Sequence, residues 1–188
     1  MSSPKLKTLF IFTLLIICFS VWGLLIWQHY HDGVPGHNLL ARKDLPFISN
    51  WWGAVVLPVF ALFMLYRINK RIPAGNNFVE TKVLKPIFRA FIFSLIYALL
   101  IVGFYSAGIS ILSRSLFLLI FLIALFAPIY RAEYYLGFVL GLSFAFGGVL
   151  PVIIGFVLVT AGFVLHKFVR RLILKIAELI GVTRLIRK

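Results

Sequence analysis

The most chemically varied part of the sequence lies between residues 28 and 50. Imidazole and carboxylate side chains occur together there, a combination that suits metal binding, proton transfer or recognition of a phosphate-bearing headgroup. Tryptophans follow it, as expected where a chain re-enters a membrane. We predict ligand contacts from a set of polar and aromatic side chains: His29, His31, Asp32, His37, Asn38, Asp44, Asn50 and Trp51.

Three interpretations of this segment stay open: a site for a polar or lipid headgroup, a metal or haem site, and a solvated loop or short interfacial helix without a ligand. His-x-His with a distant third histidine follows no strict ligand-spacing rule, so we predict no metal site and assign no cofactor. The single cysteine, Cys18, excludes an intramolecular disulfide and a cysteine-based zinc site.

A second candidate site is the short polar turn that holds Arg131 and Glu133. An ionisable group near membrane depth is costly, so it suggests function by default. Glu133 also lies at the expected start of a helix, where the helix dipole favours a carboxylate. We expect an ion pair with Arg131 or the basic tail, or a helix cap, and keep a proton or substrate role as the alternative.

The composition requires a lipid environment for the helices that carry these residues. The chain has 188 residues, of which 62% are hydrophobic and 13% charged, against about 45–50% and about 25% in soluble domains. Five acidic residues against 19 basic ones also exclude an acidic disordered chain and most soluble enzymes. We predict an all-α, polytopic integral membrane protein.

Apolar runs of a length that can cross a bilayer predict about six spans. The stretch 134–165 is too long for one crossing, and its Gly147, Gly148 and Pro151 predict a break. Asn77, with Glu80 three residues later, resembles a helix start. The expected spans are residues 9–27, 51–66, 87–106, 115–130, 134–147 and 149–165.

The distribution of basic residues predicts the orientation. Lys and Arg collect on the cytoplasmic side of membrane proteins, and six crossings place the three main basic clusters on one side, with Arg42, Lys43 and Arg114 on the other. Both termini are then cytoplasmic, in what we expect to be a bacterial inner membrane. Topology explains the +14 charge, so no nucleic-acid partner is predicted.

Two units follow from this pattern, a transmembrane bundle at 1–166 and a basic amphipathic helix at 167–188 that lies on the membrane surface or contacts a partner protein. Gly137 and Gly141 form a small-xxx-small pattern. We expect it to pack against the last span, with a homo-oligomer contact as the alternative.

For function, the polar outer loop favours binding, with modification of the ligand left open, of a lipid or amphipathic small molecule. No Asp or Glu lies well inside a predicted span, which weighs against ion-coupled transport. A small-solute transporter or channel without ion coupling and a membrane assembly or accessory subunit stay open as alternatives. Membrane lipids are the expected partners in each case.

Overall fold

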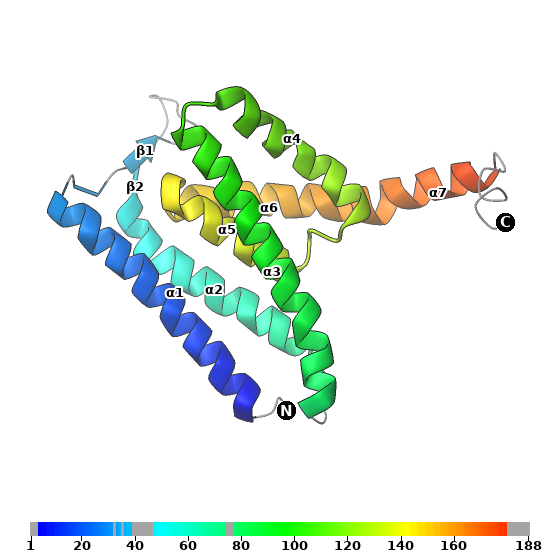
Figure 1. Cartoon of the computed structure of the whole chain (residues 1–188), viewed down its shortest axis with the longest axis horizontal. Helices are drawn as coiled ribbons and strands as arrows, with labels where there is room; N and C mark the ends of the chain where they lie inside the picture. The colour runs from blue at the N-terminus through cyan, green and yellow to red at the C-terminus, as the bar shows by residue number, and fades with distance from the viewer. Residues whose placement is uncertain (1–3, 32, 35, 39–46, 74–76, 180–188) are drawn as a thin grey trace.

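Helices form almost all of the computed structural model, which describes residues 4–31, 33–34, 36–38, 47–73 and 77–179 (Figure 1). In lipid, a helix satisfies its backbone hydrogen bonds within one segment, so apolar runs adopt it. In chain order the elements are α1 Pro4–His31, β1 Gly36–Asn38, β2 Phe47–Ser49, η2 Asn50–Trp52, α2 Gly53–Lys70, α3 Asn77–Ser106, α4 Ser110–Phe126, α5 Ala132–Phe146, α6 Val149–Val164, η3 Leu165–Val169 and α7 Arg170–Leu179.

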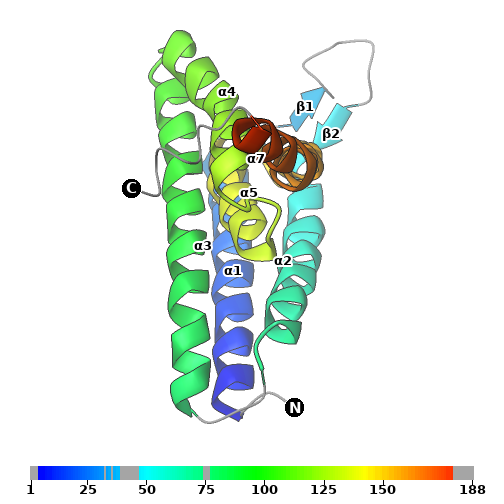
Figure 2. The same cartoon turned by 90° about the vertical axis from the view of Figure 1, so that its right-hand side faces the viewer.

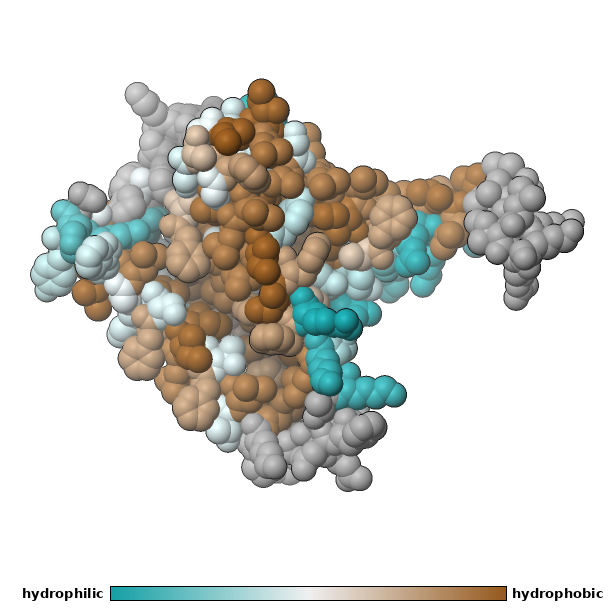
Figure 3. Space-filling view, in the orientation of Figure 1, coloured by the Kyte–Doolittle hydropathy of each residue, from teal (hydrophilic) through white to brown (hydrophobic). Residues whose placement is uncertain are grey.

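Among the described residues, four helical stretches are long and apolar enough to cross a membrane. They are Leu6–His31, Asn50–Lys70, Lys82–Ser106 and Val149–Ile176. The helices Ser110–Phe126 and Ala132–Phe146 are apolar but shorter. Hydrophobic side chains cover most of the face shown in Figure 3, which is the surface of a protein surrounded by lipid rather than water. The chain is therefore a helical membrane protein.

The short helix α5 lies at the centre of the bundle, between α3, α2 and α6 (Figures 1 and 2). Most of its residues are buried by protein, so its length need not match the lipid. A Cβ at Gly137 would overlap Ser94 Oγ and the carbonyl oxygen of Phe91, and one at Gly141 would overlap Ala98. Both glycines thus pack within the chain against α3, and the expected contact with the last span is wrong.

The last span, α6, contacts α5 through a different glycine. A Cβ at Gly155 would overlap the ring of Tyr135, whose hydroxyl donates to the carbonyl oxygen of Val152 at 2.6 Å. The side chain of Tyr97 on α3 donates in the same way to Leu116 of α4, also at 2.6 Å. These bonds give the buried phenol of Tyr135 and the half-buried phenol of Tyr97 a partner and fix the position of each helix along its neighbour.

The first helix packs mainly against α2, where the indole of Trp22 donates to the carbonyl oxygen of Ala54 at 3.1 Å. From the end of the molecule where its own N-terminus lies, α1 diverges from α3 along its length (Figure 1).

The start of α3 and the break between α5 and α6 lie where the sequence predicted a helix start and a break, whereas α4 is displaced along the chain. The third helix starts at Asn77, and Gly147, with φ 69°, separates α5 from α6. The fourth helix, however, is Ser110–Phe126 rather than 115–130. Ala127 is extended with ψ 140°, because the residue before a proline, here Pro128, is disfavoured in the helical region.

The basic tail is not separated from the last span by a turn. A π-helical segment, Leu165–Val169, joins α6 directly to α7. The α6 helix packs within the bundle, and α7 continues it and projects from the bundle (Figure 1). The π turn places His166 Nδ1 3.3 Å from the carbonyl oxygen of Ala124 at the end of α4. The expected boundary at residue 167 is thus helical backbone, and residues 180–188 lie outside the described part.

Candidate functional site

The two histidines that end α1 do not converge on a common point. His31 Nδ1 lies 3.0 Å from the carbonyl oxygen of Trp27, and its ring stacks on that indole with a centroid separation of 3.7 Å. His29 meets the edge of Trp51 at 5.8 Å. Residues two apart on a helix point in different directions, so each imidazole contacts an aromatic ring of its own.

Residues 28–50, which we call the outer segment after the side of the membrane predicted for them, contain a short antiparallel ribbon of β1 and β2 rather than only the expected loop or interfacial helix. His37 pairs with Ile48 and Asn38 with Phe47. Asp32 and Asp44, two predicted ligand residues, lie outside the described residues. Within the described part no three His, Cys, Asp or Glu residues lie together. The outer ligand site therefore remains a prediction.

Asn50 and Trp51 differ sharply in their surroundings. Asn50 is 8% exposed, and its side-chain amide occupies the place where a Cβ on Gly147 would lie. It packs the end of the outer segment against the α5–α6 turn. Trp51 is exposed, and Ser49 Oγ accepts a weak hydrogen bond from its backbone N–H at 3.4 Å. Asn50 thus has a structural contact, while Trp51 is free to meet lipid.

At the opposite end of the bundle, Glu133 forms a two-point ion pair with Arg71. The two terminal nitrogens of Arg71 donate to the two carboxylate oxygens, each at 3.0 Å. Glu133 is 2% exposed, whereas the Arg71 side chain is 41% exposed. A fork-to-fork pair of this kind is the strong form of an ion pair. It joins the end of α2 to the first turn of α5.

The partner that the sequence suggested for Glu133 is wrong. Arg131 is the N-cap residue of α5 and is exposed, and the ion pair comes instead from Arg71, 62 positions earlier in the chain. Arg71 had looked like an ordinary cytoplasmic flanking charge. A buried carboxylate requires a cation or hydrogen-bond donors. A partner for Glu133 could therefore be expected from the sequence, but the identity of that partner could not.

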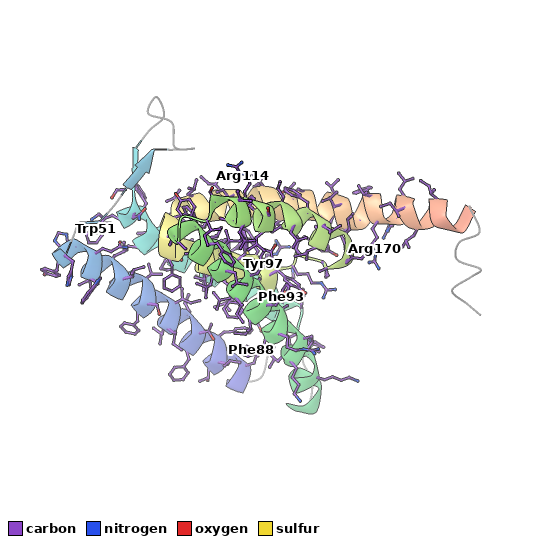
Figure 4. The ribbon with its side chains drawn as sticks, turned by 45° about the horizontal axis from the view of Figure 1, so that its top comes forward. Trp51, Phe88, Phe93, Tyr97, Arg114 and Arg170 are labelled. Atoms are coloured by element: carbon purple, nitrogen blue, oxygen red, sulfur yellow. The ribbon has the colours of Figure 1, made fainter. Side chains whose placement is uncertain are left out.

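An apolar cavity of about 390 Å³ adjoins the buried face of Glu133. Its walls come from α1, α2, α3 and α5, and Phe88 lies on the side of α3 that faces α1 (Figure 4). Its polar lining side chains are Thr13, Lys85 and Glu133. The remaining lining residues are Leu9, Phe10, Leu65, Ile68, Leu84, Ile87, Phe91 and Leu136. We call this space the α1–α3 cavity.

A second cavity, of about 360 Å³, has the opposite character. Its lining consists of Arg67, Arg71, Tyr130, Arg131 and Ala132. We call it the arginine cavity. It shares no lining residue with the α1–α3 cavity, yet Arg71 lines one and its partner Glu133 lines the other. The ion pair therefore stands between an apolar space and a cationic one.

A third cavity, of about 350 Å³, lies near the end of α3 and the starts of α4 and α6. Arg114 and Ser110 contribute polar groups to it, while Ser113 donates to the carbonyl oxygen of Ile101 at 3.3 Å. Arg114 is the one charged residue in the described lining of this cavity. It offers a ligand fewer charged contacts than the two cavities beside Arg71 and Glu133.

No protein-family model matches this chain, and neither the curated proteins nor the solved structures give a match. Function is therefore inferred from the geometry of the chain itself.

Proposed function

We propose that this protein is a six-span membrane protein that binds a lipid or another amphipathic small molecule in the α1–α3 cavity. The outer loop supplied the first hypothesis for such a ligand. The α1–α3 cavity is the better location, because it combines a large apolar wall with a few polar groups at one end, as small-molecule sites do.

The connections of the chain support six crossings with both termini on the cytoplasmic side. The starts of α1 and α3, the end of α2 and the α4–α5 connection lie toward one end of the bundle, and the β1–β2 ribbon, the α3–α4 turn and the α5–α6 turn lie toward the other (Figure 1). Arg67, Lys70 and Arg71 belong to the first end. This arrangement follows the positive-inside rule.

The observation that carries the proposal is the placement of a charged pair beside apolar space. An acyl chain or ring system would contact the leucine, isoleucine and phenylalanine walls, which exclude water. The polar part of the ligand would meet exposed Lys85 and the carboxylate face of Glu133 that Arg71 leaves free. A ligand with both an apolar body and a polar end satisfies both kinds of surface.

A cavity-filling substitution tests the proposal. Thr13 lines the cavity and donates its hydroxyl to the carbonyl oxygen of Leu9 at 2.9 Å. Thr160 makes the same kind of bond to Phe156, also at 2.9 Å, on α6. Thr13→Phe should fill the cavity, and Thr160→Phe is its matched control, because it makes the same chemical change on an exposed helix surface away from the cavity.

Binding would be measured with a lysophosphatidylcholine that carries a fluorescent acyl chain, added to purified protein in detergent. We expect saturable binding to the wild type and to Thr160→Phe, and a loss of about tenfold or more in Thr13→Phe, which corresponds to about 1.4 kcal/mol. Equal binding by all three proteins, or none by the wild type, would refute the cavity as the site. Solute flux in proteoliposomes without any retained amphiphile would favour the transporter class instead.

A further inference from the structure

The arginine cavity brings together more positive charge than its surroundings neutralise. Arg67 lies in the last turn of α2, Arg71 follows that helix, and Arg131 precedes α5. All three line one space of about 360 Å³. Like charges that share a site repel one another and cost stability unless an anion joins them.

The described carboxylates near the cavity do not neutralise all three arginines. Glu133 is the one acidic residue whose side chain belongs to the described part of the chain. Both of its oxygens already accept from Arg71, which leaves Arg67 and Arg131 without a carboxylate partner among the described residues. Two exposed guanidinium groups therefore remain available to an anion that enters the cavity.

The start of α5 adds to the positive potential. Ala132, the first residue of this 15-residue helix, lines the cavity, and no side chain caps the helix N-terminus. Free N–H groups at a helix N-terminus attract anions. Tyr130 also lines the cavity, and its ring packs against Phe163 and His166. The cavity thus brings guanidinium groups next to the start of a helix, and both kinds of donor favour the oxygens of an anion.

We propose that the arginine cavity is a binding site for a phosphate group, carried either by a lipid headgroup or by a soluble phosphate. A phosphate presents several oxygens to several donors at once, which matches the planar forks of Arg67 and Arg131 better than a single carboxylate does. Arg71 acts as a positioning residue, because its contact with Glu133 fixes the wall of the cavity. This site is separate from the amphiphile site and does not depend on it.

Removing the two uncommitted arginines together tests the site. The double variant Arg67→Gln with Arg131→Gln keeps the Arg71–Glu133 pair intact. The matched control is Arg89→Gln with Arg171→Gln, which removes the same charge from exposed positions on α3 and α7 that do not line the cavity. Size-exclusion profiles and melting temperatures would verify that both proteins fold.

Two arms distinguish the source of the phosphate. In the first, inorganic phosphate is titrated into lipid-free protein in neutral detergent. In the second, the protein is reconstituted in nanodiscs of phosphatidylcholine with phosphatidylglycerol, and retained phosphatidylglycerol is counted by native mass spectrometry. Binding in the first arm indicates a phosphate group as such, and binding in the second arm alone indicates a lipid headgroup.

In whichever arm the wild type binds, we expect the control to match it and the Arg67/Arg131 variant to bind about tenfold more weakly or worse, as loss of charged hydrogen bonds predicts. If that variant fails to fold, Arg67→Lys with Arg131→Lys replaces it, and weaker binding is again expected because an ammonium group lacks the fork. Absence of binding in both arms, or equal binding by variant and control, would overturn the proposal.

Discussion

The two ends of the bundle hold their polar residues in different ways. At the outer end, polar side chains are dense in the sequence, yet His29 and His31 each contact a separate aromatic ring and Asn50 is buried against Gly147. At the opposite end, which is predicted to be cytoplasmic and is called the inner end here, Arg71 and Glu133 meet with two hydrogen bonds of 3.0 Å, although they lie 62 positions apart in the chain. Closeness of polar residues along a chain is therefore a poor guide to their convergence in space.

This difference has a physical basis. In the proposed topology the outer segment faces water, where a polar group needs no protein partner, so its side chains can point apart. Glu133, at 2% exposed, has no access to solvent and must be paired, because an isolated buried charge costs several kcal/mol. A buried charged group must lie next to its partner, and such fixed pairs of side chains form the well-defined walls that a ligand site needs.

The largest expected effect comes from removing one partner of the inner ion pair. Arg71→Ala leaves Glu133 buried without its cation and should cost about 3 kcal/mol of stability. Glu133→Gln should cost only about 1 kcal/mol, because Arg71, at 41% exposed, can turn to water. Detergent denaturation in mixed micelles would measure both. An equal loss of stability in the two variants would contradict the idea that only Glu133 depends on the pair for burial.

A second test concerns the contact between α3 and α5 that holds the start of α5 in place. Gly137→Ala should cost about 2 kcal/mol, because the new Cβ would overlap the carbonyl oxygen of Phe91, which is backbone and cannot rotate away. Gly103→Ala on α3 is the control, since nothing lies within 4 Å of its Cβ position. It should be neutral or slightly stabilising in the same denaturation assay.

At the outer end, the coupling between Asn50 and Gly147 should be measurable but smaller. Asn50→Ala should cost about 1 kcal/mol through lost packing. Gly147→Ala adds backbone strain at φ 69° and overlap with Asn50. In a double-mutant cycle, Gly147→Ala should cost about 1 kcal/mol less in the Asn50→Ala background, because that overlap is gone. If the stability costs of the two substitutions simply add, the two residues are not in repulsive contact.

The smallest effect is expected from the outer histidines. Joint replacement of His29, His31 and His37 by glutamine should change stability by less than about 0.5 kcal/mol and leave binding of the fluorescent lysophosphatidylcholine unchanged. Metal analysis of the purified wild type would accompany this assay. Clearly weaker binding of the lipid by the triple variant would indicate that the ligand site lies in the outer loop. A stoichiometric metal in the wild type that is absent from the triple variant would indicate the same.

Much of the fold could be predicted from local features. The start of α3 at Asn77 lies where the sequence resembles a helix start, and the break at Gly147 follows from backbone freedom, and both signals act within a few residues. The end of α4 was misplaced because the apolar run continues to Ile129, while the restriction imposed by Pro128 acts on Ala127. The joining of α6 to α7 was missed because basic residues mark a membrane boundary but do not break a helix.

The candidate sites were harder to predict, because they depend on distant residues. Arg67, Arg71 and Lys85 look in the sequence like flanking charges that set topology. Arg71 also neutralises a carboxylate, Arg67 lines the arginine cavity, and Lys85 lines the α1–α3 cavity. Nothing in the spacing of these residues distinguishes them from Lys70 or Lys82, whose side chains line neither cavity.

The sequence by itself determined that the chain is a helical membrane protein, because hydrophobic length and glycine or proline breaks act locally along the backbone. Only the tertiary structure decided that α5 is central, that its glycines face α3, and that Arg71 reaches Glu133. Those outcomes depend on how helices far apart in the chain pack together. Hydrophobicity does not select among these packings, because lipid solvates any apolar helix face equally well. Close contact of small residues and the need to pair a buried charge select among these arrangements.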